Sequence, residues 1–166
     1  MKNLLKIAKR TTMGKKPSSK DDILKAVQEG GISGGITGGV VSGIKNSPGV
    51  KNRLTGVDSV KNIGVSSAKG AGRGALDAGV GQAITGGEYD DRFLPSYGRN
   101  IIGASVTGLG EGAIKAVANK NPYEVMDVWS DRVGQGMLRT AIGKSLKDTG
   151  KKAISETKEQ QKRNKK

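Results

Sequence analysis

The 166-residue chain contains no cysteine and no histidine, and its aromatic residues are one Trp, three Tyr and one Phe. These absences exclude disulfides, thiolate or imidazole metal sites, and the catalytic dyads and triads that use these side chains. Five aromatic residues are too few to anchor a large core, since aromatic side chains dominate core burial. We therefore expect a non-enzymatic protein with no cofactor and no metal, and not a densely packed α/β enzyme.

Glycine and positive charge are abundant: the chain has 27 glycines and a net charge of +14. Leu, Ile, Val and Phe account for only 35 residues, a level at which high net charge begins to favour disorder. The charge lies at the two ends, because residues 1–20 carry +7, residues 144–166 carry +6 and the middle is nearly neutral. The sequence contains no secretory signal, since the first apolar run is interrupted by Lys6 and lacks a cleavage site.

Blocks of like charge are typical of arms that bind nucleic acid, anionic lipid or an acidic partner, and equally of solubilising tails. The candidate anion-binding residues are Lys2, Lys6, Lys9, Arg10, Lys15, Lys16, Lys151, Lys152, Lys162, Arg163, Lys165 and Lys166.

Two capping signals predict where helices begin. Ser19 and Asp22 have the spacing of a capping box, which predicts a helix from about Lys20. The sequence Asn-Pro-Tyr-Glu at 121–124 offers an N-cap, a first-turn proline and a first-turn acid, so a second helix should begin there. Its apolar positions carry it to between 143 and 150, and a charged helix or tail follows.

The predicted fold is mainly α, with several Gly/Ala-rich helices in hairpins and flexible basic N- and C-terminal arms. A loop at 46–64 and a polar break at 88–97 should separate the helices. One hairpin, between 101–118 and 122–146, should be the most stable unit. The predicted regions are a basic arm at 1–19, a Gly/Ala-rich helical region at 20–118, a capped amphipathic helix at 119–150 and a basic tail at 151–166.

The most informative pattern is the recurrence of small residues four positions apart. Residues at this spacing share one helix face, so the rows form ridges with almost no side chain, which lets another backbone approach closely. The candidate helix-packing residues are Gly31, Gly35, Gly39 and Gly43, the adjoining row of Gly30, Gly34 and Gly38, then Gly74, Ala75, Gly79 and Ala83, and finally Ala104, Gly108 and Gly112.

The glycine content favours an environment that enforces helix formation. Each of the seven glycines in 30–44 weakens a helix in water by roughly 1 kcal/mol relative to alanine. In lipid the backbone must satisfy its own hydrogen bonds, so helix is nearly obligatory. The uncharged run of 15 residues is nevertheless shorter than the roughly 20 residues of a span. These segments suit a protein that is soluble first and inserts or self-associates later; the alternative is a closely packed soluble helix set.

The glycine rows between residues 30 and 118 resemble the glycine-zipper segments of the internal, ejected virion proteins of bacteriophages, including DNA pilot proteins. The resemblance implies a protein that leaves the particle with the genome and helps to form a conduit through the envelope. It implies residence in the virion interior or host cytoplasm, followed by transfer to a membrane. The implied partners are further copies or other helical proteins, an anionic membrane and DNA bound through the basic arms.

Two other functions fit the same pattern. The rows are also similar to those of membrane-permeabilising effectors of bacterial secretion systems, which reach their membrane by a different route. A basic protein for nucleic-acid packaging or assembly, which never meets a membrane, is the third possibility.

Overall fold

The structure, a computed structural model, describes residues 16–45 and 56–164. These residues form four helices and no strand, which confirms the mainly α fold. The helices are α2 (Lys20–Lys45), α3 (Gly56–Thr85), α4 (Phe93–Asn119) and α5 (Glu124–Arg163).

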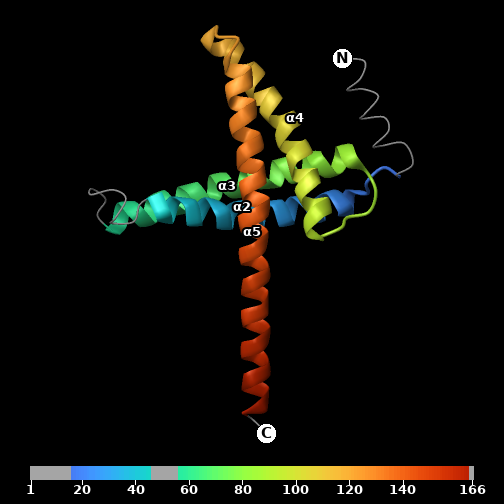
Figure 1. Cartoon of the computed structure of the whole chain (residues 1–166), viewed down its shortest axis with the longest axis vertical. Helices are drawn as coiled ribbons and strands as arrows, with labels where there is room; N and C mark the ends of the chain where they lie inside the picture. The colour runs from blue at the N-terminus through green and yellow to red at the C-terminus, as the bar shows by residue number, and fades with distance from the viewer. Residues whose placement is uncertain (1–15, 46–55, 165–166) are drawn as a thin grey trace.

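The helices form two hairpins that cross each other (Figure 1). Helices α2 and α3 lie side by side as the first hairpin, and α4 and α5 form the second. Helix α5 passes over α2 near its middle and then continues well beyond the crossing. The hairpin predicted between 101–118 and 122–146 is therefore present as part of α4 and α5.

The predicted capping signals explain how α2 and α5 begin. Ser19 Oγ accepts a hydrogen bond from the backbone N–H of Asp22 at 3.1 Å, and Asp22 Oδ2 accepts one from the backbone N–H of Ser19 at 3.3 Å. This reciprocal pair is a capping box, and α2 begins at Lys20, directly after Ser19. Helix α5 begins at Glu124, and in the turn directly before it Asn121 Oδ1 accepts a hydrogen bond from the backbone N–H of Tyr123 at 3.1 Å, which is the bond expected of an N-cap residue.

Two predicted non-helical regions are partly helical. Residues 56–64 were expected in a loop, but they are the first turns of α3. Ile63, within those turns, approaches Gly39 and Gly43 of α2, so packing against the neighbouring helix extends α3 toward its N-terminus. Helix α4 begins at Phe93, inside the predicted polar break. Residues 46–55 lie outside the described part of the chain.

No break in the helix marks the predicted boundary at 150/151, and of the two forms predicted beyond it, a charged helix or a tail, the described residues form a helix. Helix α5 continues without interruption to Arg163, so the described part of the expected flexible C-terminal arm is helical. A single glycine inside a helix weakens it by only about 1 kcal/mol, and no proline follows Gly150. The predicted N-terminal arm is described only from Lys16 onward.

The turn between α3 and α4 is fixed by glycine and by hydrogen bonds. Gly86 and Gly87 have φ angles of 66° and 79°, a left-handed conformation that favours glycine and ends α3. Beyond them, Asp90 accepts two hydrogen bonds from the Arg92 side chain, at 3.0 and 2.7 Å through Oδ2. Hydrogen bonding to Arg92 lowers the pKa of Asp90 to about 2.

Candidate functional site

One face of α2 has almost no side chains and lies directly against the backbone of α3. A methyl group added at Gly30, Gly34 or Gly38 would overlap carbonyl oxygens of α3. The contact is reciprocal, because a methyl group at Gly70 or Gly74 would overlap the carbonyl oxygens of Gly34 and Gly30. This is the close backbone approach that small residues at four-residue spacing permit. The row of Gly30, Gly34 and Gly38 thus forms a helix contact within one chain, between α2 and α3 of the first hairpin.

The neighbouring glycine row of α2 lies beside this contact. A methyl group at Gly31 would be 3.6 Å from the Ala75 methyl, and one at Gly35 would be 3.5 Å from another alanine methyl. At Gly39 it would crowd a serine hydroxyl at 2.6 Å, and at Gly43 its nearest neighbour would be 4.0 Å away. The two rows therefore differ in how much a side chain would disturb them.

The remaining predicted packing residues are divided among other contacts. Gly108 and Gly112 face α5, where a methyl group would meet heavy atoms at 2.9 and 2.8 Å, and Ala104 beside them is fully buried. Gly79 lies against α2, with a valine methyl 2.7 Å from its added Cβ. Ala83 is on the exposed side of α3.

Four glycines that the row pattern did not single out also lie at close contacts between helices. Gly81, Gly103 and Gly143 lie where the two hairpins meet, and Gly136 lies between α5 and α4 within the second hairpin. None of them belongs to a row at four-residue spacing, so that spacing gives no signal for them. A methyl group at Gly81, Gly103, Gly136 or Gly143 would overlap atoms of Arg99, Asp77, Ala104 or Ser33, respectively.

Charged side chains fill the crossing between the hairpins. Asp77 of α3 forms ion pairs with Arg132 and Arg139 of α5, at 2.9 and 3.0 Å, and all three side chains are less than a tenth exposed. Thr107 of α4 donates a hydrogen bond to the same carboxylate at 2.5 Å. Burial lowers the pKa of Arg139, an effect that the Asp77 charge opposes. Glu111 adds a second carboxylate, 3.2 Å from Arg132 Nε.

A second buried ion pair lies further along α5. Glu29 of α2 is 3.2 Å from Lys144 Nζ and 3.6 Å from Lys147 Nζ, and the Glu29 and Lys144 side chains are both buried. Lys144 Nζ also donates a hydrogen bond to Ser96 Oγ of α4 at 3.3 Å. Polar contacts therefore join α5 to each of the other helices.

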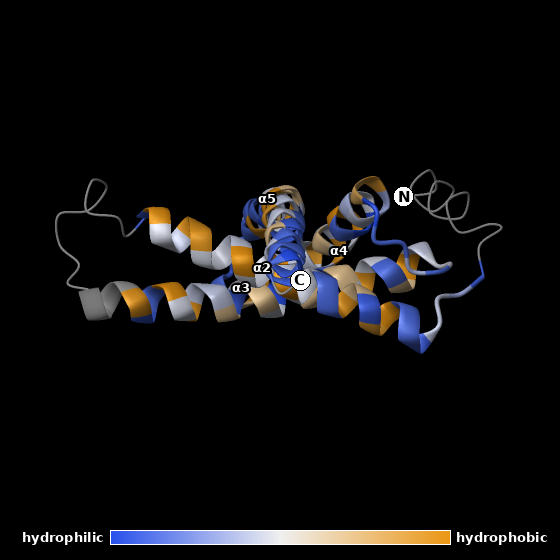
Figure 2. Cartoon of the chain, turned by 90° about the horizontal axis from the view of Figure 1, so that it is seen from below, coloured by the Kyte–Doolittle hydropathy of each residue, from blue (hydrophilic) through white to orange (hydrophobic). Residues whose placement is uncertain are grey.

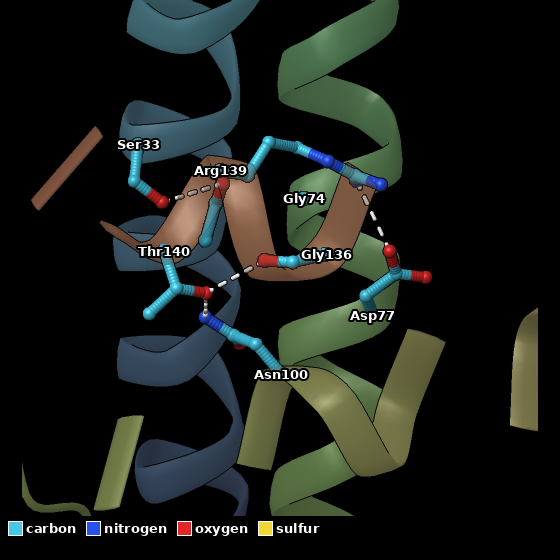
Figure 3. Close-up of a pocket in the computed structure, with 8 residues that line it drawn as sticks. Ser33, Gly74, Asp77, Asn100, Gly136, Arg139 and Thr140 are labelled. Carbon is cyan, nitrogen blue, oxygen red and sulfur yellow. Dashed lines mark hydrogen bonds and ion pairs between the residues drawn. The ribbon is translucent and has the colours of Figure 1, made fainter. Parts of the chain in front are cut away.

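A polar cavity of about 10 Å³ lies where the helices meet (Figure 3). Asn100 Nδ2 donates a hydrogen bond to Thr140 Oγ1 at 2.8 Å, and Arg139 reaches across toward Asp77. This volume is about that of one water molecule, too small for an organic substrate. Two larger hollows, of about 660 and 620 Å³, are open grooves on the surface.

The charged side chains described above are buried at the crossing, whereas most large apolar side chains are not buried. Apart from glycine, the buried apolar residues of the described chain are Ala26, Ala78, Ala104 and Val128. Among the described residues, twenty large apolar side chains are exposed. Figure 2 shows bands of hydrophobic residues recurring along α2, α3 and α4, whereas the end of α5 is largely hydrophilic. The molecule thus has a polar interior at the crossing and a substantially apolar exterior.

On α4 the exposed apolar residues form a continuous stripe. Val106, Leu109, Gly110, Ala113 and Val117 have the spacing of one helix face. The exposed fraction rises from 47% at Val106 to 81% at Val117. Within the described residues, α4 is the one helix long and apolar enough to cross a membrane, and 22% of its apolar window is buried.

The predicted anion-binding residues are only partly described. Lys16 is exposed just before α2, and Lys151, Lys152, Lys162 and Arg163 are exposed on the C-terminal half of α5. The residues outside the described ranges are Lys2, Lys6, Lys9, Arg10, Lys15, Lys165 and Lys166.

The described residues contain no group of three or more Asp or Glu side chains placed to hold a metal ion. The features that stand out are therefore the glycine contacts, the buried ion pairs, the apolar exterior and the basic half of α5. Comparisons with protein-family models, with curated protein sequences and with solved structures give no significant match.

Proposed function

We propose that this chain is a non-enzymatic helical protein that packs on or inserts into a membrane, in the manner of a phage internal virion protein that takes part in genome delivery. The observation that carries the proposal is the inverted distribution of side chains. Ion pairs occupy the helix crossing, whereas twenty large apolar side chains in the described part of the chain are exposed.

The free energy gained by burying apolar side chains favours an apolar environment for this exterior. Burying one Val, Leu or Ile side chain stabilises a protein by roughly 1.5–3 kcal/mol, and most of this contribution is forgone at the exposed positions. The ion pairs inside add little in compensation, because the desolvation of buried charges offsets their attraction. Contiguous exposed apolar surface marks sites that bind a membrane or another protein. Contact with lipid would recover the missing stabilisation.

Helix α4 is the part of the chain best suited to enter first. Its 27 residues span about 40 Å at 1.5 Å per residue, more than the roughly 30 Å of a hydrocarbon core. Its apolar stripe, the residues from Val106 to Val117 named above, is already exposed, so no side chain must be uncovered before it contacts lipid.

The glycine contact gives the first hairpin a role in the same process. Because α2 and α3 touch through their backbones, the pair forms a narrow unit whose outer sides carry β-branched residues such as Ile32 and Val40. In lipid, such close packing supplies helix association without a hydrophobic driving force. The buried charge of Asp77 is already paired, so it would not enter as an isolated ion.

Flotation with vesicles of a neutral phosphatidylcholine tests the proposal, since neutral lipid removes the attraction of the basic ends. The intact chain should float with the vesicles. Val106→Lys should reduce the bound fraction most, because Val106 is in the middle of α4 and a lysine at the centre of a membrane helix is unfavourable by roughly 2.5–3.5 kcal/mol. Val117→Lys should reduce it less, because a lysine near the end of a helix can reach the membrane interface.

Ile154→Lys is the matched control for these variants. It adds the same charge at an exposed apolar position, 59% accessible, but lies on the hydrophilic half of α5. It should float like the unmodified chain. A chain that stays entirely in the aqueous fractions, or equal losses in all three variants, would contradict the proposal.

A further inference from the structure

The C-terminal half of α5 is a helix that stands apart from the rest of the molecule. All its residues from Asp148 to Arg163 are exposed, and Figure 1 shows this part extending away from the crossing. At 1.5 Å per residue it is about 24 Å long. We refer to residues 148–163 as the α5 arm. Its sequence contains no aromatic residue, and Ile154 is its one large apolar side chain.

Five lysines form a narrow line along α5. Lys144, Lys147, Lys151, Lys158 and Lys162 are separated by three, four, seven and four positions. At 100° per residue, these positions fall within an arc of about 60°. We refer to the described residues before the α5 arm as the body. The first two lysines lie in the body and contact the Glu29 carboxylate. The last three continue the same line into the arm, where they have no ion pair with any described residue.

The adjoining side of the arm has a different charge balance. Lys152 lies four positions from Asp148 and from Glu156, and Arg163 lies four positions from Glu159, a spacing that places side chains next to each other on a helix. This side carries two positive and three negative charges. The excess positive charge of the arm is therefore concentrated on the lysine line.

We propose that the line formed by Lys151, Lys158 and Lys162 binds the phosphate backbone of double-stranded DNA, without reading sequence. Lysine side chains act on phosphates as point charges, and a straight helix presents them as a linear array to a linear polyanion. The contacts of Lys144 and Lys147 with Glu29 hold the line in a fixed orientation relative to the body. This binding is independent of the proposed membrane function.

DNA fits the arm better than lipid or single strands do. A helix that lies on a membrane surface needs an apolar face, and the arm has one large apolar residue. Binding of single strands relies on aromatic side chains that stack on bases, and the arm has none. The backbone of the duplex requires only positive charge at a suitable spacing.

The test compares two double variants that remove equal charge one residue apart. Lys151→Gln/Lys162→Gln changes the lysine line, whereas Lys152→Gln/Arg163→Gln changes the adjoining side. Glutamine has nearly the helix propensity of lysine and arginine, so equal circular dichroism at 222 nm would show that the arm is intact. Affinity for a 20-base-pair duplex is measured by fluorescence anisotropy at several salt concentrations, and the slope of log K against log salt is compared.

The slope of the Lys151→Gln/Lys162→Gln variant should be shallower by about 1.8, which is two phosphate contacts at 0.9 each. The slope of the control should change by less than half that amount, and two duplexes of different sequence should behave alike. Equal slope changes in both variants, or no binding of the intact chain at low salt, would overturn the proposal. The proposal would also be overturned if Lys151→Gln/Lys162→Gln left DNA binding unchanged and weakened only the binding to vesicles containing phosphatidylserine. That result would assign the lysine line to a membrane.

Discussion

Asp77 of α3 and Arg132 of α5 form an ion pair at 2.9 Å, with side chains only 2% and 3% exposed. Arg139 shares the same carboxylate, and Glu111 supplies a second carboxylate to Arg132, so two acidic side chains balance the two buried arginines of α5. The crossing therefore depends on a charge balance that a single substitution can disturb.

Asp77→Asn should destabilise the soluble fold by about 3–5 kcal/mol, the usual effect of removing one partner from a buried ion pair. Equilibrium urea denaturation followed by circular dichroism measures the change. Asp91→Asn, at an exposed position before α4, is the control and should lie within about 0.5 kcal/mol of the unmodified chain.

A triple variant tests whether the instability of Asp77→Asn comes from buried arginines that have lost their partner. Replacing all three ions, as Asp77→Leu/Arg132→Met/Arg139→Met, leaves no arginine without its carboxylate, and Glu111 keeps its ion pairs with Arg73 and Lys115, so most of the lost stability should be recovered. If Asp77→Asn alone were as stable as the control, the crossing would not depend on this carboxylate.

Two adjacent glycines of α2 should respond to alanine with opposite signs. Gly34→Ala forces a methyl group into the backbone of α3 and should destabilise by about 1–3 kcal/mol, as overpacking does. Gly35→Ala reaches only ordinary contact distance and should stabilise by up to about 1 kcal/mol through helix propensity. Thermal denaturation of both variants measures the difference. Equal shifts would mean that the two helices do not approach as described.

The sequence predicted the helical class and the capping box because both depend on local spacing. Ser19 and Asp22 are three residues apart, and the row of Gly30, Gly34 and Gly38 lies within one segment. It also predicted the hairpin of α4 and α5, since a short turn leaves little choice of neighbour. These features can be read without knowing the rest of the fold.

The crossing could not be predicted in the same way. Asp77 lies in a segment rich in small residues, and it pairs with arginines more than fifty positions away. Gly103 and Gly143 belong to no row, and a methyl group at either would overlap atoms of another helix, at Asp77 and Ser33 respectively. Partners of this kind are determined by the tertiary arrangement, and one sequence gives no spacing from which to infer them.

The turn before α4 predicts a measurable pH dependence. Hydrogen bonding to Arg92 lowers the pKa of Asp90 from 3.8 to about 2, so the charged carboxylate is favoured in the folded protein. A carboxyl group with a lowered pKa contributes stability above its unfolded value of 3.8 and loses it as the pH falls through about 2. NMR titration of the Asp90 carboxyl carbon should show this midpoint, and Arg92→Gln should return it toward 3.8. A titration midpoint that is unchanged by Arg92→Gln would mean that Arg92 does not form these hydrogen bonds with Asp90 in solution.

Removing the α5 arm should not change the free energy of unfolding of the body. Its residues are exposed, and the last contacts of α5 with the rest of the chain involve Lys144 and Lys147. Deleting residues 151–166 should therefore leave the free energy of unfolding within about 0.5 kcal/mol of the full chain, since it removes no buried side chain. Urea denaturation measures this value, and amide hydrogen exchange of the full chain should show 148–163 exchanging faster than 128–143.

The same deletion distinguishes the two proposed interactions. Removal of the arm lowers the salt dependence of DNA binding, because it removes the whole lysine line beyond the body. Binding to neutral vesicles should persist, because the apolar stripe of α4 is unchanged. A truncated chain that unfolds more readily would show that the arm packs against the body in solution. A truncated chain that stays folded but no longer binds neutral vesicles would assign membrane contact to the arm, and α4 would lose its proposed role.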